Sequence, residues 1–370
     1  MDLIYRFLGW FLGQVDKVIY LVRFLPSQLG GRFFSNGYGD TERVLRHNDF
    51  IFKAVREAKS KTPDLLDIRE GIQWQPEKTL TGNISIRSAH FTSPCAHLLP
   101  MESKKCRFYY VQPVQEFHRA SVVLILLPGT GEAGKNKRLG MARRLAEEYG
   151  WSSVIVTAPF YAARRPKDQT AFFVSSAERM MIQGTAIMVE AAALGCYFLS
   201  QSPSSKVCYS GFSWGAAMSA GASMMTLACQ PDGKRLACVP FVGCGSPSII
   251  ADGALESVID WTALKRKSDE TYIENKERLL RKLAEVTMDE LLAIVSEQGK
   301  CLGSLRLASM TNDYFIGSDH SNTFTKQVME VTGSSTDIKV TTLLGGHVVA
   351  ALIRPWYQKR FIVEAVQALS

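Results

Sequence analysis

The sequence predicts an α/β protein built on a mainly parallel sheet that helices cover on both faces. Short runs of β-branched and aromatic residues alternate with longer segments of helical periodicity, which is typical of βαβ units. The chain has 370 residues, of which 46% are hydrophobic and 21% charged, so it can form a large core. This composition excludes a disordered, a collagenous and a small disulfide-stapled protein.

The predicted strands are short and apolar and are bounded by turn residues. They cover residues 107–112, 122–127, 154–158, 206–210, 239–243, 304–309 and 337–344. Helical patterns cover residues 137–149, 176–201, 214–229, 322–331 and 350–369. Residues 207–231 carry no charge and are long enough to span a membrane, but their Gly, Ala, Ser and Met content favours a buried strand, turn and helix.

One insertion interrupts the alternation of strands and helices. Residues 255–300 are rich in Lys, Glu, Asp and Leu with a helical period, and they separate two predicted strands. We expect them to form a helical cap over the carboxyl edge of the sheet, where such folds bind ligands. The main domain is then expected to cover residues 63–370.

Residues 1–62 are expected to form an amphipathic N-terminal segment. Its apolar residues at helical spacing favour one face, while its charged residues exclude a simple membrane span. The apolar set is Leu3, Phe7, Phe11, Ile19 and Val22, and the charged set is Arg6, Asp16, Lys17 and Arg23. A membrane-interface helix, an import signal and a surface helix docked on the core all fit this pattern.

The cysteines and the net charge narrow the possible partners. The sequence has eight cysteines, and none of them forms a C-x-x-C pair or a cluster with histidine. We therefore expect reduced, buried thiols and no metal site. The net charge is +8, and basic residues follow two predicted turns, at 135–144 and at 164–167. Such clusters suit anionic head groups or simply a solvated surface, and no nucleic-acid-binding motif accompanies them.

Ser213 is the predicted nucleophile. It is the central residue of a G-x-S-x-G pentapeptide, residues 211–215, between a predicted strand and a helix of small residues. A strand-to-helix turn with flanking glycines holds the serine Oγ clear of the sheet at the positive end of a helix.

A serine needs a base, and the base needs a carboxylate to orient it. His347 follows a predicted strand through two glycines, whereas His320 is the lesser candidate in a polar loop. Asp313 follows the preceding predicted strand, and Asp319 is the alternative. The chain order Ser213, Asp313, His347 is that of the α/β-hydrolases.

The oxyanion of the tetrahedral intermediate needs backbone donors. The amide of Trp214 directly follows the nucleophile and is the first predicted donor. The turn at 127–131 follows a predicted strand and offers Thr130, with Gly129 as the neighbouring possibility.

Several segments together resemble the α/β-hydrolase domain-containing protein 18 family. They are His90–Pro94 with His97, Pro128–Gly131, Pro159–Tyr161, Arg164–Gln169, Gly211–Gly215 and Gly345–His347, and the similarity runs from about Ala89 to the C-terminus. The resemblance implies an α/β-hydrolase fold, the triad named above and a role in lipid metabolism. It also implies association with mitochondria and a cardiolipin-like substrate.

The sequence therefore predicts a serine hydrolase that cleaves carboxylic esters, with the acyl chain of a membrane phospholipid as substrate. Arg164, Arg165 and Lys167 are expected to bind its head group, whereas His90 and His97 are interpreted as structural. The alternatives are a thioesterase or peptidase using the same triad and a non-catalytic lipid-binding scaffold. We expect no cofactor, no metal and no nucleic-acid partner, but peripheral attachment to a mitochondrial or another intracellular membrane. The oligomeric state stays open.

Overall fold

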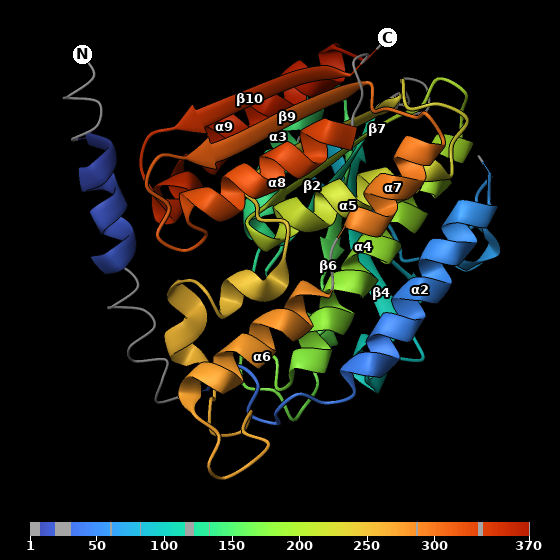
Figure 1. Ribbon diagram of the computed structural model, residues 1–370. Coiled ribbons are helices and arrows are strands. Elements are labelled where there is room, and N and C mark those ends of the chain that lie inside the picture. The colour runs from blue at the N-terminus through green and yellow to red at the C-terminus, as the bar shows by residue number, and fades with distance from the viewer. Residues whose placement is uncertain are drawn as a thin grey trace.

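The protein is described here from a computed structural model that covers residues 8–18, 31–59, 61–81, 83–114, 122–132, 134–285, 288–331 and 336–369. Within these residues ten strands form one sheet in the order β1-β3-β4-β6-β5-β7-β8-β9-β10, with β2 paired to β3. Strands β5 to β10 run parallel, and β1 to β4 form an antiparallel edge that joins β6. Figure 1 shows the helices packed around this sheet.

The bounds of the strands are β1 (Gln73–Trp74), β2 (Lys78–Thr81), β3 (Ile84–Thr92), β4 (Lys105–Pro113), β5 (Val122–Leu127), β6 (Ser152–Thr157), β7 (Lys206–Phe212), β8 (Leu236–Phe241), β9 (Ser304–Met310) and β10 (Asp337–Leu343). The main helices are α2 (Thr41–Glu57), α3 (Asn136–Tyr149), α4 (Ala177–Ser200), α5 (Trp214–Ala228), α6 (Tyr272–Ala284), α7 (Asp289–Glu297), α8 (Ser318–Val331) and α9 (His347–Gln367). A further helix covers residues 8–18.

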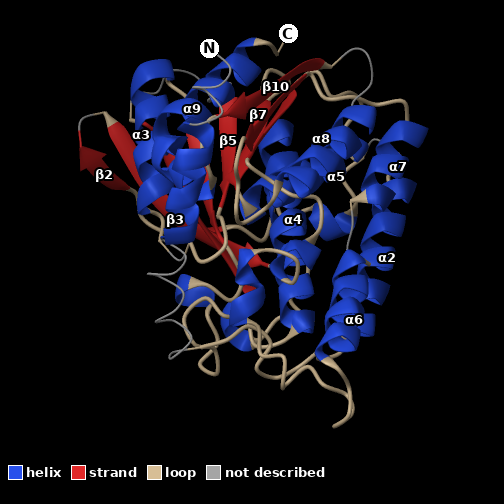
Figure 2. Cartoon of the chain, turned by 60° about the vertical axis from the view of Figure 1, so that its left-hand side comes forward, coloured by secondary structure: helices blue, strands red, loops and turns tan. Residues whose placement is uncertain are grey.

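The central strands are buried on both faces, as a parallel sheet between two helical layers requires. In β5, Val123, Ile125 and Leu127 belong to the core under α4 and α5, while the alternate residues belong to the core under α3 and α9. Figure 2 shows α3 and α9 on one side of the sheet and α4, α5 and α8 on the other. The predicted mainly parallel sheet with helices on both faces is confirmed.

Each predicted strand is present, whereas the antiparallel strands β1, β2 and β3 were not predicted. The two-residue β1 is too short to show a period. β3 carries Arg87, Ser88 and His90 among its apolar residues, so its alternation of buried and partly exposed side chains is incomplete. Residues 207–231 form β7, a turn and α5, as the composition predicted.

One helix among those described, α4, is long and apolar enough to cross a membrane. Nearly all of its apolar window is buried inside the fold, because α4 packs against α5 and the sheet. Within this fold, α4 is therefore a buried core helix.

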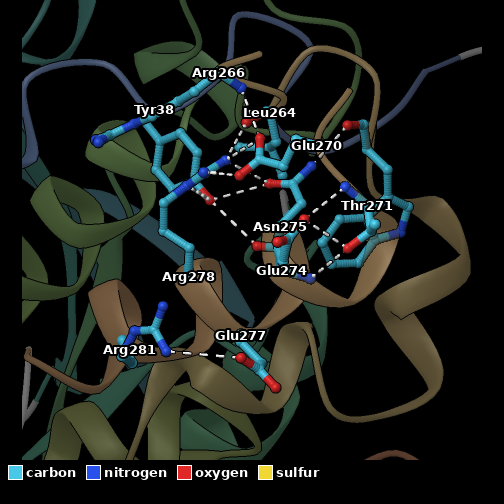
Figure 3. A network of polar contacts seen from close by, with 11 residues as sticks. Tyr38, Leu264, Arg266, Glu270, Thr271, Glu274, Asn275, Glu277, Arg278 and Arg281 are labelled. Carbon is cyan, nitrogen blue, oxygen red and sulfur yellow. Dashed lines mark hydrogen bonds and ion pairs between the residues drawn. The ribbon is translucent and has the colours of Figure 1, made fainter. Parts of the chain in front are cut away.

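The region predicted to be a cap contains α6 and α7, which lie between β8 and β9. A polar network ties the loop before α6 to that helix (Figure 3). Arg278 pairs with Glu270 and donates to the Leu264 carbonyl at 2.9 Å, and Asn275 Nδ2 donates to the Trp261 carbonyl at 2.9 Å. These contacts give the loop a defined conformation.

The boundary predicted at residue 62 is wrong, because the chain joins the main core from residue 33 onward. Phe33 and Phe34 are fully buried, and their amides donate to the carbonyls of Val258 and Val174 at 2.9 Å. The Tyr38 hydroxyl also enters the cap network, where Arg278 Nε donates to it at 3.2 Å. Of the predicted apolar set of the N-terminal segment, Phe11 is 56% exposed, and Leu3, Phe7, Ile19 and Val22 lie outside the described residues.

Candidate active site

Ser213 occupies the sharp turn between β7 and α5. Its backbone has φ 57° and ψ −121°, a conformation that costs a non-glycine residue energy and is held by its surroundings. A Cβ at Gly211 would lie 2.0 Å from the Gly215 carbonyl oxygen, and one at Gly215 would lie 2.6 Å from the Pro128 oxygen. The two glycines of the pentapeptide are therefore required by close backbone approach, and the turn has the geometry of a nucleophile elbow.

Asp313 lies in the loop after β9, and His347 is the first residue of α9, which follows the adjacent strand β10. His347 Nδ1 is 2.8 Å from Asp313 Oδ2, and the other carboxylate oxygen accepts from the amides of Phe315 and Ile316 at 2.8 and 2.9 Å. The Asp313 side chain is 3% exposed and the His347 side chain 12%. This is the carboxylate–imidazole arrangement that fixes a tautomer and stabilises an imidazolium.

The imidazole also lies beside the serine turn. The ring of Phe212, the residue before Ser213, is 4.8 Å from the His347 ring, and Phe315 is 5.3 Å from it on a tilted plane. Ser213 and His347 both belong to the described residues, and no hydrogen bond joins their side chains in this structure. In enzymes without bound substrate such contacts are commonly long and tighten in the reacting complex.

Electrostatics couple the pair. Burial opposes the charged form of Asp313, but the charge and hydrogen bond of His347 outweigh burial and lower the pKa of that carboxyl. Burial likewise opposes protonation of His347, but Asp313, and to a lesser degree Asp16, raise the pKa of the imidazole above its ordinary value of 6.5. A histidine with this environment is suited to accept and return a proton near neutral pH.

The structure separates the three predicted oxyanion donors. The amides of Trp214 and Thr130 donate to no acceptor among the described residues. The amide of Gly129, in contrast, donates to Glu132 Oε2 at 3.2 Å, so Gly129 is not free to bind an oxyanion. A Cβ at Gly129 would lie 3.8 Å from the Ser213 Cβ, so this glycine brings the loop close to the nucleophile.

Glu132 belongs to a buried network that the sequence did not reveal. It pairs with Arg138 of α3 at 3.0 Å and with Arg354 of α9 at 3.1 Å, and Arg354 Nε donates to Gln358, which in turn donates to Ser210 Oγ. Burial raises the pKa of Glu132, but the two guanidinium groups outweigh it and keep the pKa low. The network joins the loop at 129–132 to Ser210 of β7, the strand that leads into Ser213. Arg138 is consequently buried rather than part of a basic surface.

The head-group prediction for Arg164 is wrong. Its side chain is fully buried in a double hydrogen bond to Glu190 of α4, at 2.7 and 2.6 Å, and it also donates to the carbonyls of Thr157 and Ser103. Arg165 and Lys167 are exposed, as an anion-binding role requires. The guanidinium of Arg164 instead fixes the turn after β6 to α4.

The remaining candidates lie apart from the Asp313–His347 pair. His320 Nε2 lies 3.1 Å from Asp252, and Asp319 is exposed at the start of α8. His97 packs against His47 with ring centroids 4.4 Å apart, and His90 lies on β3. Both positions agree with the structural interpretation of His90 and His97.

Comparisons with known proteins identify the family and the fold. The acetyl xylan esterase 1 of Thermoanaerobacterium sp. JW/SL YS485 aligns with 92% of this chain and 98% of its own at 15% identity and a TM-score of 0.51. The acetyl xylan esterase of Paenibacillus sp. R4 aligns with 91% of this chain and 98% of its own at 12% identity and a TM-score of 0.52. Residues 31–313, which include Ser213 and Asp313, match the family described as alpha/beta hydrolase domain containing 18. The chain belongs to this α/β-hydrolase family.

Proposed function

We propose that the protein is a serine hydrolase that cleaves carboxylic esters. The contact between Asp313 and His347 beside the strained Ser213 turn is the observation that carries this proposal. Ser213 Oγ attacks the acyl carbonyl while His347 takes its proton, and the amides of Trp214 and Thr130 bind the oxyanion. His347 then protonates the leaving alcohol, and water attacks the acyl-enzyme with His347 as base, releasing the acid.

A narrow apolar pocket of about 30 Å³ is lined by Trp214, the residue after the nucleophile, and it would hold an acyl chain only when its side chains move apart. Trp214 and Met218 of α5 line it together with Met180, Met181 and Met188 of α4, and it is closed by residues of α2 and the start of α7. Methionine side chains are flexible and polarisable, so they adapt to a chain of variable shape. This lining favours an aliphatic acyl group over a sugar acetate.

A membrane phospholipid is the finer part of the proposal. Leu8, Trp10 and Phe11 are 44%, 53% and 56% exposed on the helix at 8–18. Exposed aromatic and aliphatic side chains of this kind are typical of helices that lie at a membrane interface. Exposed Arg165 and Lys167, and the net charge of +8, favour an anionic head group. A cardiolipin-like substrate and mitochondrial attachment stay predictions from the family resemblance.

The acyl pocket is tested with a series of p-nitrophenyl esters from acetyl to palmitoyl. The variant Met218→Trp fills the pocket, and Met101→Trp is the matched control because Met101 is 76% exposed. We expect Met218→Trp to lower kcat/KM for octanoyl and longer esters by about tenfold or more while acetyl ester hydrolysis changes by about twofold at most. An equal loss for all chain lengths, or no loss, would show that this pocket does not hold the acyl chain.

The leaving group is tested on matched substrates with one acyl chain. We expect the oxygen ester to be cleaved with a higher kcat/KM than the corresponding thioester or amide. Preference for the thioester would identify a thioesterase, and preference for the amide a peptidase, on the same triad.

A further inference from the structure

Asp16 is a buried carboxylate that the mechanism above does not use. It lies on the helix at 8–18 and is fully buried. Its Oδ2 accepts from the amides of His347 at 2.6 Å and Tyr314 at 3.2 Å, and its Oδ1 accepts from the amide of Val348 at 2.7 Å. One carboxylate therefore binds the backbone of His347 itself and of the residue after Asp313.

The Asp16 carboxylate caps the N-terminus of α9, although Asp16 belongs to a different helix. The first amides of a helix have no intrahelical acceptor, and the N-cap residue of α9, Gly346, has no side chain to supply one. A Cβ at Gly346 would lie 2.3 Å from Asp16 Oδ2, so the approach of the carboxylate depends on glycine there. A negative charge at this end also complements the helix dipole.

The helix at 8–18 is shaped to deliver this carboxylate. Gly9, Gly13 and Asp16 follow the spacing i, i+4, i+7, so they share one face. A Cβ at Gly9 would lie 3.0 Å from Thr311 Oγ1, and one at Gly13 would lie 2.6 Å from the Asn312 Cβ. Figure 1 shows this helix in dark blue beside the end of the sheet where β10 ends and α9 begins.

We propose that Asp16 is a positioning residue for the triad, so that docking of the helix at 8–18 holds His347 and the loop of Asp313 in the catalytic arrangement. The proposal rests on the proposed serine hydrolase function. It gives the N-terminal segment a part in the active site. The face with Gly9, Gly13 and Asp16 packs against the loop of Asp313 and the start of α9. Leu8, Trp10 and Phe11 lie away from this contact and are exposed.

The kinetic test compares Asp16→Asn and Asp16→Ala with Val18→Ala, whose side chain is 57% exposed on the same helix. Displacement of a catalytic group by about 1 Å can cost on the order of 10²-fold in rate. We expect kcat for a short soluble ester to fall at least tenfold in Asp16→Ala and less in Asp16→Asn, which keeps an acceptor oxygen, while KM changes about twofold at most. Val18→Ala should behave as wild type. Equal kcat in all four proteins with the helix still docked would overturn the proposal.

A second measurement separates this proposal from the proposed function. His347 lies against two carboxylates, Asp313 from the loop after β9 and Asp16 from the N-terminal helix. Titration of the His347 ring by NMR, assigned with His347→Gln, should give a lower midpoint in Asp16→Asn than in wild type, whether or not the protein turns over an ester. A shifted midpoint without any esterase activity would sustain the role of Asp16 and refute the hydrolase. An unchanged midpoint together with an unchanged kcat would refute the role of Asp16.

Discussion

At the residue scale, the properties of His347 follow from what surrounds its ring. Asp313 holds Nδ1 at 2.8 Å, and the aromatic rings of Phe212 and Phe315 shield the imidazole from water. Burial alone would lower the pKa of this histidine, and the neighbouring carboxylates reverse that effect. Replacing Asp313 should therefore change the pKa of His347.

The pH dependence of hydrolysis should report this balance. Only neutral imidazole accepts the serine proton, so kcat/KM should fall as the pH drops through the pKa of His347, with a midpoint above 6.5 because that pKa is raised. Asp313→Asn should move the midpoint to lower pH and reduce kcat by about 10³- to 10⁴-fold. Rate profiles over a range of pH check this, and a midpoint that does not move in Asp313→Asn would contradict the pairing.

Ser213, Asp313 and His347 could be proposed from sequence because each comes shortly after a strand, and parallel strands end at one edge of the sheet. The same logic misled for Arg164, which also follows a strand. Whether a charged side chain turns outward depends on its partner, and the partner of Arg164, Glu190, lies 26 residues away on α4. Asp16 was noted only as a charge that interrupts an apolar segment, although its spacing from Gly9 and Gly13 was visible.

At the element scale, the buried pair of Arg164 and Glu190 fixes α4 to the turn after β6. Both side chains are fully buried, and Arg164 satisfies two backbone carbonyls as well. The charge of Glu190 outweighs burial and raises the pKa of Arg164. Removing one member leaves the other charge buried without compensation.

Breaking this pair should destabilise the fold without touching the triad. We expect Glu190→Gln to lower the free energy of unfolding by about 3–5 kcal/mol. The matched control is Asp168→Asn, because Asp168 pairs with Arg179 at 2.8 Å but is 52% exposed, and it should cost about 1 kcal/mol at most. Urea unfolding measures both, and comparable losses in the two variants would refute the importance of the buried pair.

At the scale of the whole molecule, the order of elements was predictable and the packing of the N-terminal part was not. Alternating strands and helices gave the parallel sheet and both helical layers. Residues 1–62 were predicted as a segment outside the main domain, yet the face of α2 with Val44, Ile51 and Val55 is fully buried. A surface helix buries only one apolar stripe of its side chains, so the average polarity of the segment does not show that it packs against the core.

The triad itself is tested most directly by labelling the folded protein with a fluorophosphonate probe, which reacts with activated serines. Wild type should be labelled, Ser213→Ala should not, and Ser219→Ala should be labelled like wild type, since Ser219 lies farther along α5 and donates to the Ala216 carbonyl. His347→Gln should slow the labelling strongly because the serine then lacks its base. Folded wild type that stays unlabelled, or labelling that persists in Ser213→Ala, would contradict Ser213 as the nucleophile.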